Sequence, residues 1–191
     1  MRLRAELLPE AQRAKFIHDL KEMEDLVGSS LDLFADLGKS RKRYPVDINA
    51  LLDGITTDWT DTGHQVLLTG RAHSAYPTEP SMLKRAINNL VSNGIRYGKQ
   101  VEISIIDSPR QLRIFIRDHG PGIPEADRER VFEPFVRLEP SRNRDSGGSG
   151  IGMAISRNIA RWHQGDIYLD NAIDGGLIAE LRLPRRPDTS S

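Results

Sequence analysis

The sequence contains no cysteine among its 191 residues, which excludes disulfide bonds, thiolate zinc sites and cysteine nucleophiles. It also has no excess of either charge, because 27 lysine and arginine residues balance 27 aspartate and glutamate residues. No general electrostatic attraction to nucleic acid is therefore expected. No apolar run approaches membrane-spanning length, and residues 1–4 lead into charged residues rather than a secretory signal. We expect the chain as given to be soluble, with no contact to a membrane or to nucleic acid.

The first 40 residues have the pattern of helices. Between residues 11 and 37, apolar side chains recur at steps of three and four residues, as in an amphipathic helix: Phe16, Leu20, Met23, Val27, Leu31 and Phe34. Pro9 interrupts the pattern, so residues 3–8 are predicted to end a preceding helix. Because the apolar stripe is too narrow to form a core, we expect a helical hairpin that pairs with a second copy of the chain. A helix packed on its own domain is the alternative.

A polar, basic stretch at residues 38–45 indicates a linker to a second region. Helices are predicted there at residues 49–59, with Asn49 as a possible N-cap, 80–96 and 149–163. Strands are predicted at residues 65–69, 101–106, 112–117, 167–169 and 178–183. Since helices and antiparallel strands segregate, residues 41–184 are expected to form one α+β domain, a two-layer sandwich. Residues 185–191 are expected to be a disordered tail.

Two asparagines lie four residues apart on the helix predicted at 80–96. Asn89 and Asn93 therefore project from one face, where a carboxamide oxygen suits Mg²⁺ whose other ligands are waters and nucleotide phosphates. Arg96 and Tyr97 follow. Arg96 can donate hydrogen bonds to phosphate, and the Tyr97 ring offers a flat surface beside a ligand. Gly94 costs this helix about 1 kcal/mol relative to alanine, which predicts the close approach of another group. The alternative is a pair of solvated surface asparagines.

A carboxylate and two glycines follow the strand predicted at 112–117. Gly120 and Gly122 let the backbone turn tightly beside Asp118. A buried carboxylate needs a donor, and the exocyclic amine of adenine supplies one, whereas guanine presents a carbonyl oxygen at the matching position. We therefore expect adenine to be preferred over guanine. A plain Asp-Gly turn is the alternative.

A third glycine cluster at residues 148–152 precedes the helix predicted at 149–163. Free backbone amides at a helix N-terminus, together with the helix dipole, bind phosphate. No lysine follows the glycines, so the cluster is not a Walker motif. The polar loop before it carries Arg137, Arg142 and Arg144, which could close over phosphates as a mobile lid. Ordinary solvated arginines are the alternative.

Taken in order, these segments resemble the catalytic ATP-binding domain of two-component sensor histidine kinases over residues 46–184. Residues 89–97 resemble the family's N box, 118–122 its first glycine box, 132–138 its F box and 148–152 its last glycine box. The resemblance implies a Bergerat-type fold that binds ATP and Mg²⁺, with Asn93 as the metal ligand, Asn89 in support and Asp118 as the adenine anchor. The implied nucleotide-binding set is Asn89, Asn93, Arg96, Tyr97, Asp118, Gly120, Gly122, Ile123, Phe135, Arg137, Arg142, Gly148, Ser149, Gly150, Ile151 and Gly152.

Asn89 and the F box together distinguish branches within the wider superfamily. The chaperone, gyrase and mismatch-repair ATPases resemble the histidine kinases elsewhere but have a water-activating glutamate at the position of Asn89. An amide cannot take a proton from water. The sequence thus favours phosphoryl transfer to a protein side chain over ATP hydrolysis. A related serine kinase is one alternative, although such kinases lack the long helix at 11–37, and a non-catalytic nucleotide-sensing or dimerisation module is another.

The N-terminal helices resemble the second half of a dimerisation and histidine-phosphotransfer hairpin. The acceptor segment, in which a histidine is followed by an acidic residue, a basic residue and Ser/Thr-Pro, is absent. His18 is followed by an acidic residue, as in the acceptor segment, but the proline is absent. We expect His18 to be a surface residue. No catalytic residue is therefore assigned, and the chain is expected to be a fragment that does not phosphorylate itself. The intact protein would be an inner-membrane sensor with this part in the cytoplasm, a homodimer through these helices, and the partner of a response-regulator receiver domain.

Overall fold

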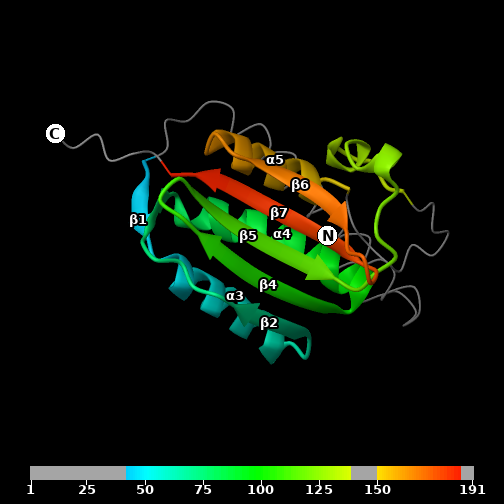
Figure 1. Ribbon diagram of the computed structural model, residues 1–191, viewed down its shortest axis with the longest axis horizontal. Coiled ribbons are helices and arrows are strands. Elements are labelled where there is room, and N and C mark those ends of the chain that lie inside the picture. The colour runs from blue at the N-terminus through cyan, green and yellow to red at the C-terminus, as the bar shows by residue number, and fades with distance from the viewer. Residues whose placement is uncertain (1–41, 139–149, 186–191) are drawn as a thin grey trace, which may run out of the picture.

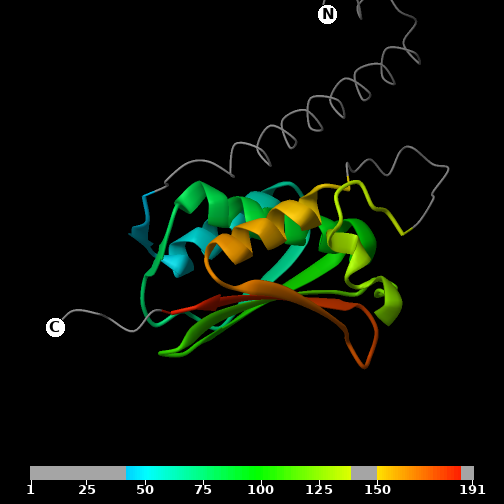
Figure 2. The ribbon, with the colours of Figure 1, turned by 90° about the horizontal axis from the view of Figure 1, so that it is seen from above.

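The computed structural model describes residues 42–138 and 150–185, which form a layer of helices on one face of a sheet (Figure 1, Figure 2). The helices are α3 (Ile48–Asp61), α4 (Pro80–Gly98) and α5 (Gly152–Trp162), with the short 3-10 helices η1 (Glu125–Asp127) and η2 (Arg130–Phe132). The strands are β1 (Tyr44–Val46), β2 (Gln65–Thr69), β3 (Tyr76–Thr78), β4 (Gln100–Asp107), β5 (Gln111–Asp118), β6 (Asp166–Asn171) and β7 (Leu177–Pro184). The predicted two-layer α+β sandwich is confirmed.

The main sheet has the strand order β2-β4-β5-β7-β6, and β1 pairs with β3 in a separate two-stranded sheet. All neighbours in the main sheet are antiparallel except β2 and β4, which run parallel. The expectation of purely antiparallel strands is therefore wrong at this edge. Helix α4 connects these two strands and returns the chain to the same end of the sheet, as a parallel pair requires (Figure 1).

Alternating side chains divide the sheet into a buried and an open face. In β5, the residues that face the helices are fully or almost fully buried: Leu112, Ile114 and Ile116. They pack against the inner side of α4, which contributes Leu83, Ile87, Leu90 and Val91. Burial of a side chain of this size is worth roughly 1.5–3 kcal/mol, so these two elements anchor the core.

Among the described residues, no helix is long and apolar enough to cross a bilayer.

The small sheet β1–β3 lies beside the C-terminal end of α5. The guanidinium of Arg43 stacks 4.3 Å from the ring centre of Trp162 and donates to the Trp162 carbonyl oxygen at 2.9 Å. Next to it, the buried His163 ring contacts Thr78 Oγ1 through Nε2 at 2.7 Å and Ile159 O through Nδ1 at 2.8 Å. The start of the folded domain is thus fixed to the end of α5.

The five predicted strands agree with β2, β4, β5, β6 and β7 to within two residues at each end, but several other boundaries differ. Helix α3 is capped by Asp47 and not by Asn49, because the Asp47 carboxylate accepts from the backbone amides of Asn49 and Ala50. Helix α5 begins at Gly152, three residues later than predicted. Arg185, which we assigned to the tail, belongs to the domain, because its guanidinium binds the Asp107 carboxylate at 2.7 and 2.9 Å. That carboxylate has only 1% exposure.

Some predictions fall on residues outside the described ranges. The N-terminal helices at 1–40, with His18, are among them, as is the tail at 186–191. The same holds for three members of the implied nucleotide-binding set, which are Arg142, Gly148 and Ser149.

Candidate nucleotide-binding site

Two glycines bring the C-terminal half of α4 against the end of β5. A Cβ added to Gly94 would lie 2.7 Å from Val101 Cγ2, and one added to Gly98 would lie 2.7 Å from the Cβ of Asp118. Contacts this short are not found between real Cβ atoms, so only glycine permits the approach. The close contact predicted at Gly94 is confirmed. It sets the helix that carries Asn89 and Asn93 beside the Asp118 loop.

The Asp118 carboxylate is oriented by the backbone around it. The side chain is buried, and its Oδ1 accepts from the amide of Gly120 at 2.8 Å and from the amide of Leu177 at 3.1 Å. Gly176 closes the site from the β6–β7 hairpin, with φ +95° and a Cβ position that would fall on the Asp118 carbonyl oxygen. Among the described residues, no hydrogen bond reaches Oδ2, so this oxygen can accept a donor from a ligand.

The loop after Asp118 is held from two sides. Gly120 lies against α4, since a Cβ there would be 2.9 Å from Tyr97 O. On the other side, the side chain of Asn171 accepts from the Ile123 amide at 2.9 Å and donates to the Ile123 carbonyl at 3.0 Å. Asn171 was missed by the sequence pattern, because an asparagine at a strand end is typical of an ordinary turn.

Asn89 connects the two helices that flank the site. Its Nδ2 donates to the carbonyl oxygen of Gly152 at 3.2 Å. Ser156 Oγ lies 3.0 Å from the same oxygen and 3.0 Å from Ala86 O, which joins the first turn of α5 to α4. Asn93, one turn further along α4, is half-buried, and its side chain makes no hydrogen bond to other described residues. Its carboxamide is the one that remains available to a ligand.

The first turn of α5 has no side-chain cap among the described residues. Ile151 precedes it as the N-cap residue, with no hydrogen bond from its side chain to the turn. The amides of the first helical turn are therefore left without the usual side-chain acceptor, and such groups attract phosphate oxygens. Gly150, with φ +67°, lies directly before this turn.

The F box and the last glycine box are joined by a backbone hydrogen bond. The Phe135 amide donates to Gly150 O at 3.0 Å, and Phe135 itself has φ +69°, which is uncommon for a bulky residue. The residue is 63% exposed. Arg137 is also exposed, and no contact among the described residues brings it to the other predicted phosphate-binding groups.

Arg157 fixes the base of the F box to α5. Its guanidinium stacks 4.2 Å from the ring centre of Phe132 and pairs with Asp166 at 2.8 Å and Glu129 at 2.6 Å. The hydrogen bond that Arg157 donates to Asp166, and then the one it donates to Glu129, raise the pKa of Arg157 above its ordinary value despite its burial. This residue too was missed, because an arginine on a helix is usually solvated.

A metal at this site would depend on few protein ligands. Among the described residues, no group of three His, Cys, Asp or Glu side chains could hold an ion. The half-buried carboxamide of Asn93 is a neutral oxygen ligand, which fits Mg²⁺ bound mainly through phosphates and water. The predicted Asn93 site is compatible with this donor chemistry.

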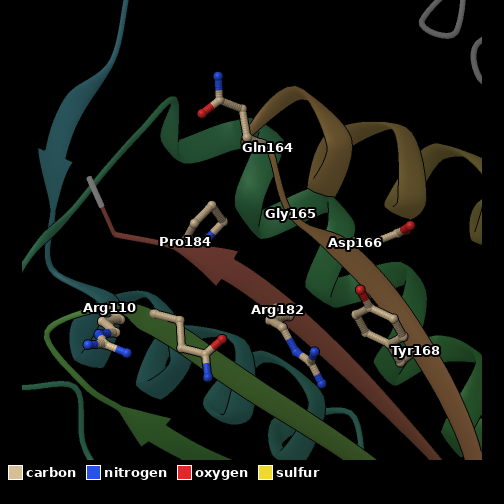
Figure 3. A pocket seen from close by; sticks show the side chains of 8 residues that line it. Arg110, Gln164, Gly165, Asp166, Tyr168, Arg182 and Pro184 are labelled. Atoms are coloured by element: carbon tan, nitrogen blue, oxygen red, sulfur yellow. The ribbon is translucent and has the colours of Figure 1, made fainter. Parts of the chain in front are cut away.

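A separate hollow lies on the open face of the sheet, away from α4 and the Asp118 loop (Figure 3). Its prominent side chains are already paired: Arg182 donates to Glu180 at 2.9 and 3.0 Å and stacks 4.3 Å from the Tyr168 ring centre. Burial acts to raise the pKa of Glu180, but the hydrogen bonds and positive charges of Arg182 and Arg113 hold it below its ordinary value. These groups form part of the sheet surface and do not belong to the candidate nucleotide site.

The fold and the three converging motifs define a nucleotide-binding α/β sandwich domain. Residues 78–187 match the family described as histidine kinase-, DNA gyrase B- and HSP90-like ATPases. The chain belongs to this family of ATP-binding domains.

Relatives identify the branch of the family. The chain is 40% identical over 186 residues to the sensor histidine kinase GtrS of Pseudomonas aeruginosa, covering 97% of this chain and 38% of the relative. It is 33% identical over 190 residues to the sensor-like histidine kinase SenX3 of Mycolicibacterium smegmatis, covering 98% of this chain and 46% of the relative. The crystal structure of the ATP-binding domain of PrrB from Mycobacterium tuberculosis superimposes with a TM-score of 0.63 and 29% identity, over 77% of this chain and 100% of that one.

These matches make the chain similar to histidine-kinase ATP-binding domains, as the order of its motifs predicts. The chain spans less than half the length of the two full-length relatives named above.

Proposed function

We propose that this chain is the catalytic part of a sensor histidine kinase and donates the γ-phosphoryl group of ATP to a histidine side chain. We favour phosphoryl transfer over ATP hydrolysis because of the chemistry of Asn89. Its amide is neutral and donates to Gly152, so it cannot act as the base that activates water. An efficient ATPase, which is the alternative, would need a base at this position, and Asn89 does not supply one.

Each motif has a part in holding the nucleotide. Asp118 Oδ2 accepts from the exocyclic amine of adenine, beside the loop that contains Gly120, Gly122 and Ile123. Asn93 contributes an oxygen ligand to Mg²⁺, whose charge offsets that of the phosphates. The first turn of α5, whose N-cap residue Ile151 provides no side-chain acceptor, receives phosphate oxygens. Further phosphate contacts come from arginines, for which Arg96, Arg137 and Arg142 are the candidates.

Transfer forms a bond between a histidine nitrogen and the γ-phosphorus and breaks the bond to the β,γ-bridging oxygen, so that ADP leaves. The protein's task is to position the reactants and to stabilise charge. The histidine belongs to a helical hairpin of the intact protein, which also forms the homodimer. From there the phosphoryl group passes to an aspartate of a response-regulator receiver domain. We propose that the intact protein lies in the inner membrane, with this part in the cytoplasm.

Incubation with γ-labelled ATP, Mg²⁺ and a separately produced hairpin that carries an acceptor histidine tests this function. We expect acid-labile, alkali-stable label on the hairpin and none on the chain itself. Label on the chain would contradict the expectation that it lacks an acceptor histidine, and His18 would then be the candidate acceptor. Binding of ATP without any transfer would instead support a non-catalytic nucleotide-sensing module, and label on serine a serine kinase.

A further inference from the structure

The side chain of Asn171, at the end of β6, holds both backbone groups of one residue in the loop after Asp118. Its Oδ1 accepts from the Ile123 amide at 2.9 Å, and its Nδ2 donates to the Ile123 carbonyl at 3.0 Å. An amide side chain satisfies a donor and an acceptor together in this way, whereas a carboxylate or an aliphatic side chain cannot. The contact therefore depends on the identity of the residue at position 171.

Gly122 fits against the same side chain. It has φ +73°, and a Cβ at this position would lie 2.6 Å from Asn171 Oδ1. The loop thus approaches Asn171 more closely than any residue with a side chain could, and it does so next to Asp118.

The end of β6 makes a second attachment to this region. Asp170 pairs with Arg128, just after η1, at 2.9 Å, and the Asn171 amide donates to the Asp170 carboxylate at 2.9 Å. Residues 119–124 themselves belong to no helix or strand. The loop is consequently held by contacts at its two sides, from α4 and from the end of β6.

We propose that Asn171 is a positioning residue for nucleotide binding, which acts through Ile123 to hold the glycine loop in the shape that receives adenine. The inference rests on the proposed function of this site. Without the contact, the loop would have to be ordered when the nucleotide binds. The free-energy cost of that ordering would make binding weaker. Asn171 itself need not touch the ligand.

The chain contains a matched control for this contact. Asn49 makes the same arrangement with Ala72, accepting from its amide at 2.8 Å and donating to its carbonyl at 3.0 Å. This pair joins α3 to the loop after β2, at the opposite edge of the sheet from β6 (Figure 1). Asn49 is half-buried and Asn171 is exposed, so the control substitution should disturb the fold at least as much.

The experiment compares Asn171→Asp with Asn49→Asp at pH 7.5. An ionised aspartate can still accept from the backbone amide, but its second oxygen faces a carbonyl oxygen and repels it. Affinity for ADP with Mg²⁺ is measured by titration calorimetry, and stability of the free domains by thermal unfolding. We expect Asn171→Asp to bind ADP about tenfold more weakly than the wild type, and Asn49→Asp to bind within about twofold in spite of an equal or larger loss of stability.

Equal ADP affinity for Asn171→Asp and the wild type would overturn the inference, and so would an equal loss in Asn49→Asp. If Asn171→Asp does not fold, Asn171→Ala removes both hydrogen bonds without adding charge and carries the same expectation. No binding by the wild type would overturn the proposed function as well, whereas a wild type that binds while Asn171→Asp is unaffected overturns only the role of Asn171.

Discussion

The backbone amide of Phe135 donates to the carbonyl oxygen of Gly150 at 3.0 Å, and both residues have a left-handed conformation, with φ +69° and +67°. The chain between them leaves the F box and returns at the first turn of α5. Phe135 and Gly150 are therefore held together by a backbone hydrogen bond at the two ends of this stretch.

Gly150→Ala should weaken nucleotide binding. A Cβ at this position would lie 2.9 Å from the Phe135 carbonyl carbon, and the left-handed conformation costs an alanine roughly 1–2 kcal/mol. Displacement of the first turn of α5 is expected to reduce ATP affinity about tenfold, as measured by calorimetry. Gly54→Ala is the matched control, because it lies within α3 with no atom within 4 Å of its Cβ position. It should raise stability by about 1 kcal/mol and leave affinity unchanged.

Asp118→Asn should change which base is preferred. The amide oxygen of the new side chain can keep the hydrogen bonds from Gly120 and Leu177, so its NH2 group takes the place of Oδ2. A donor would then face the adenine amine but could serve the guanine carbonyl. We expect ATP affinity to fall by at least tenfold, roughly 1.4 kcal/mol, and GTP affinity not to fall. An equal loss for both nucleotides would show that the substitution only damages the loop.

Chelation of Mg²⁺ should lower ATP affinity in the wild type but have little further effect in Asn93→Ala. The half-buried Asn93 carboxamide is the proposed protein ligand of the ion. Asn88→Ala, five residues earlier on α4, is the control, since Asn88 Oδ1 accepts from Trp59 Nε1 at 3.0 Å in the core region. It should reduce stability by about 1–3 kcal/mol and keep the response to the metal. Titrations with and without chelator measure both effects.

Stability should fall as the pH drops below the ordinary pKa of histidine. Burial, and secondly the positive charge of Arg43, lower the pKa of His163, although the contact with Ile159 acts to raise it. The folded state therefore holds the ring neutral, while the unfolded state takes up a proton below about pH 6.5. The loss begins there and levels off below the folded pKa, with a slope of at most about 1.4 kcal/mol per pH unit.

Urea unfolding at a series of pH values measures this effect. His163→Gln, which cannot titrate, should be less stable than the wild type but should lose the extra slope. Substitution of the exposed His73 by glutamine is the control and should preserve the slope. A slope that persists in His163→Gln would assign it to another group.

The fold was largely predictable because its central strands alternate regularly between apolar and polar residues. The runs at 101–106 and 112–117 differ from β4 and β5 by one residue at each end. The strands β1 and β3 were missed, since each has only three residues and contains a proline, Pro45 or Pro77. Their pairing is set by contacts between segments that are distant in the sequence.

The candidate site was predictable where a residue's chemistry is itself informative. Asp118, Asn93 and the glycines have distinctive residue types at motif spacings. Asn171 and Arg157 could not be found in this way, because their roles come from what they contact. Asn49 illustrates the same limit, since a residue expected to cap a helix instead holds Ala72.

Titration of the wild-type chain with ATP and with GTP, each in the presence of Mg²⁺, tests the central claim most directly. The claim is that Asp118, held by two backbone amides on one oxygen, presents the other oxygen to adenine. ATP should bind at least about tenfold more tightly than GTP, since the guanine carbonyl would face a carboxylate oxygen without a proton between them. Equal affinity for the two nucleotides would contradict the account.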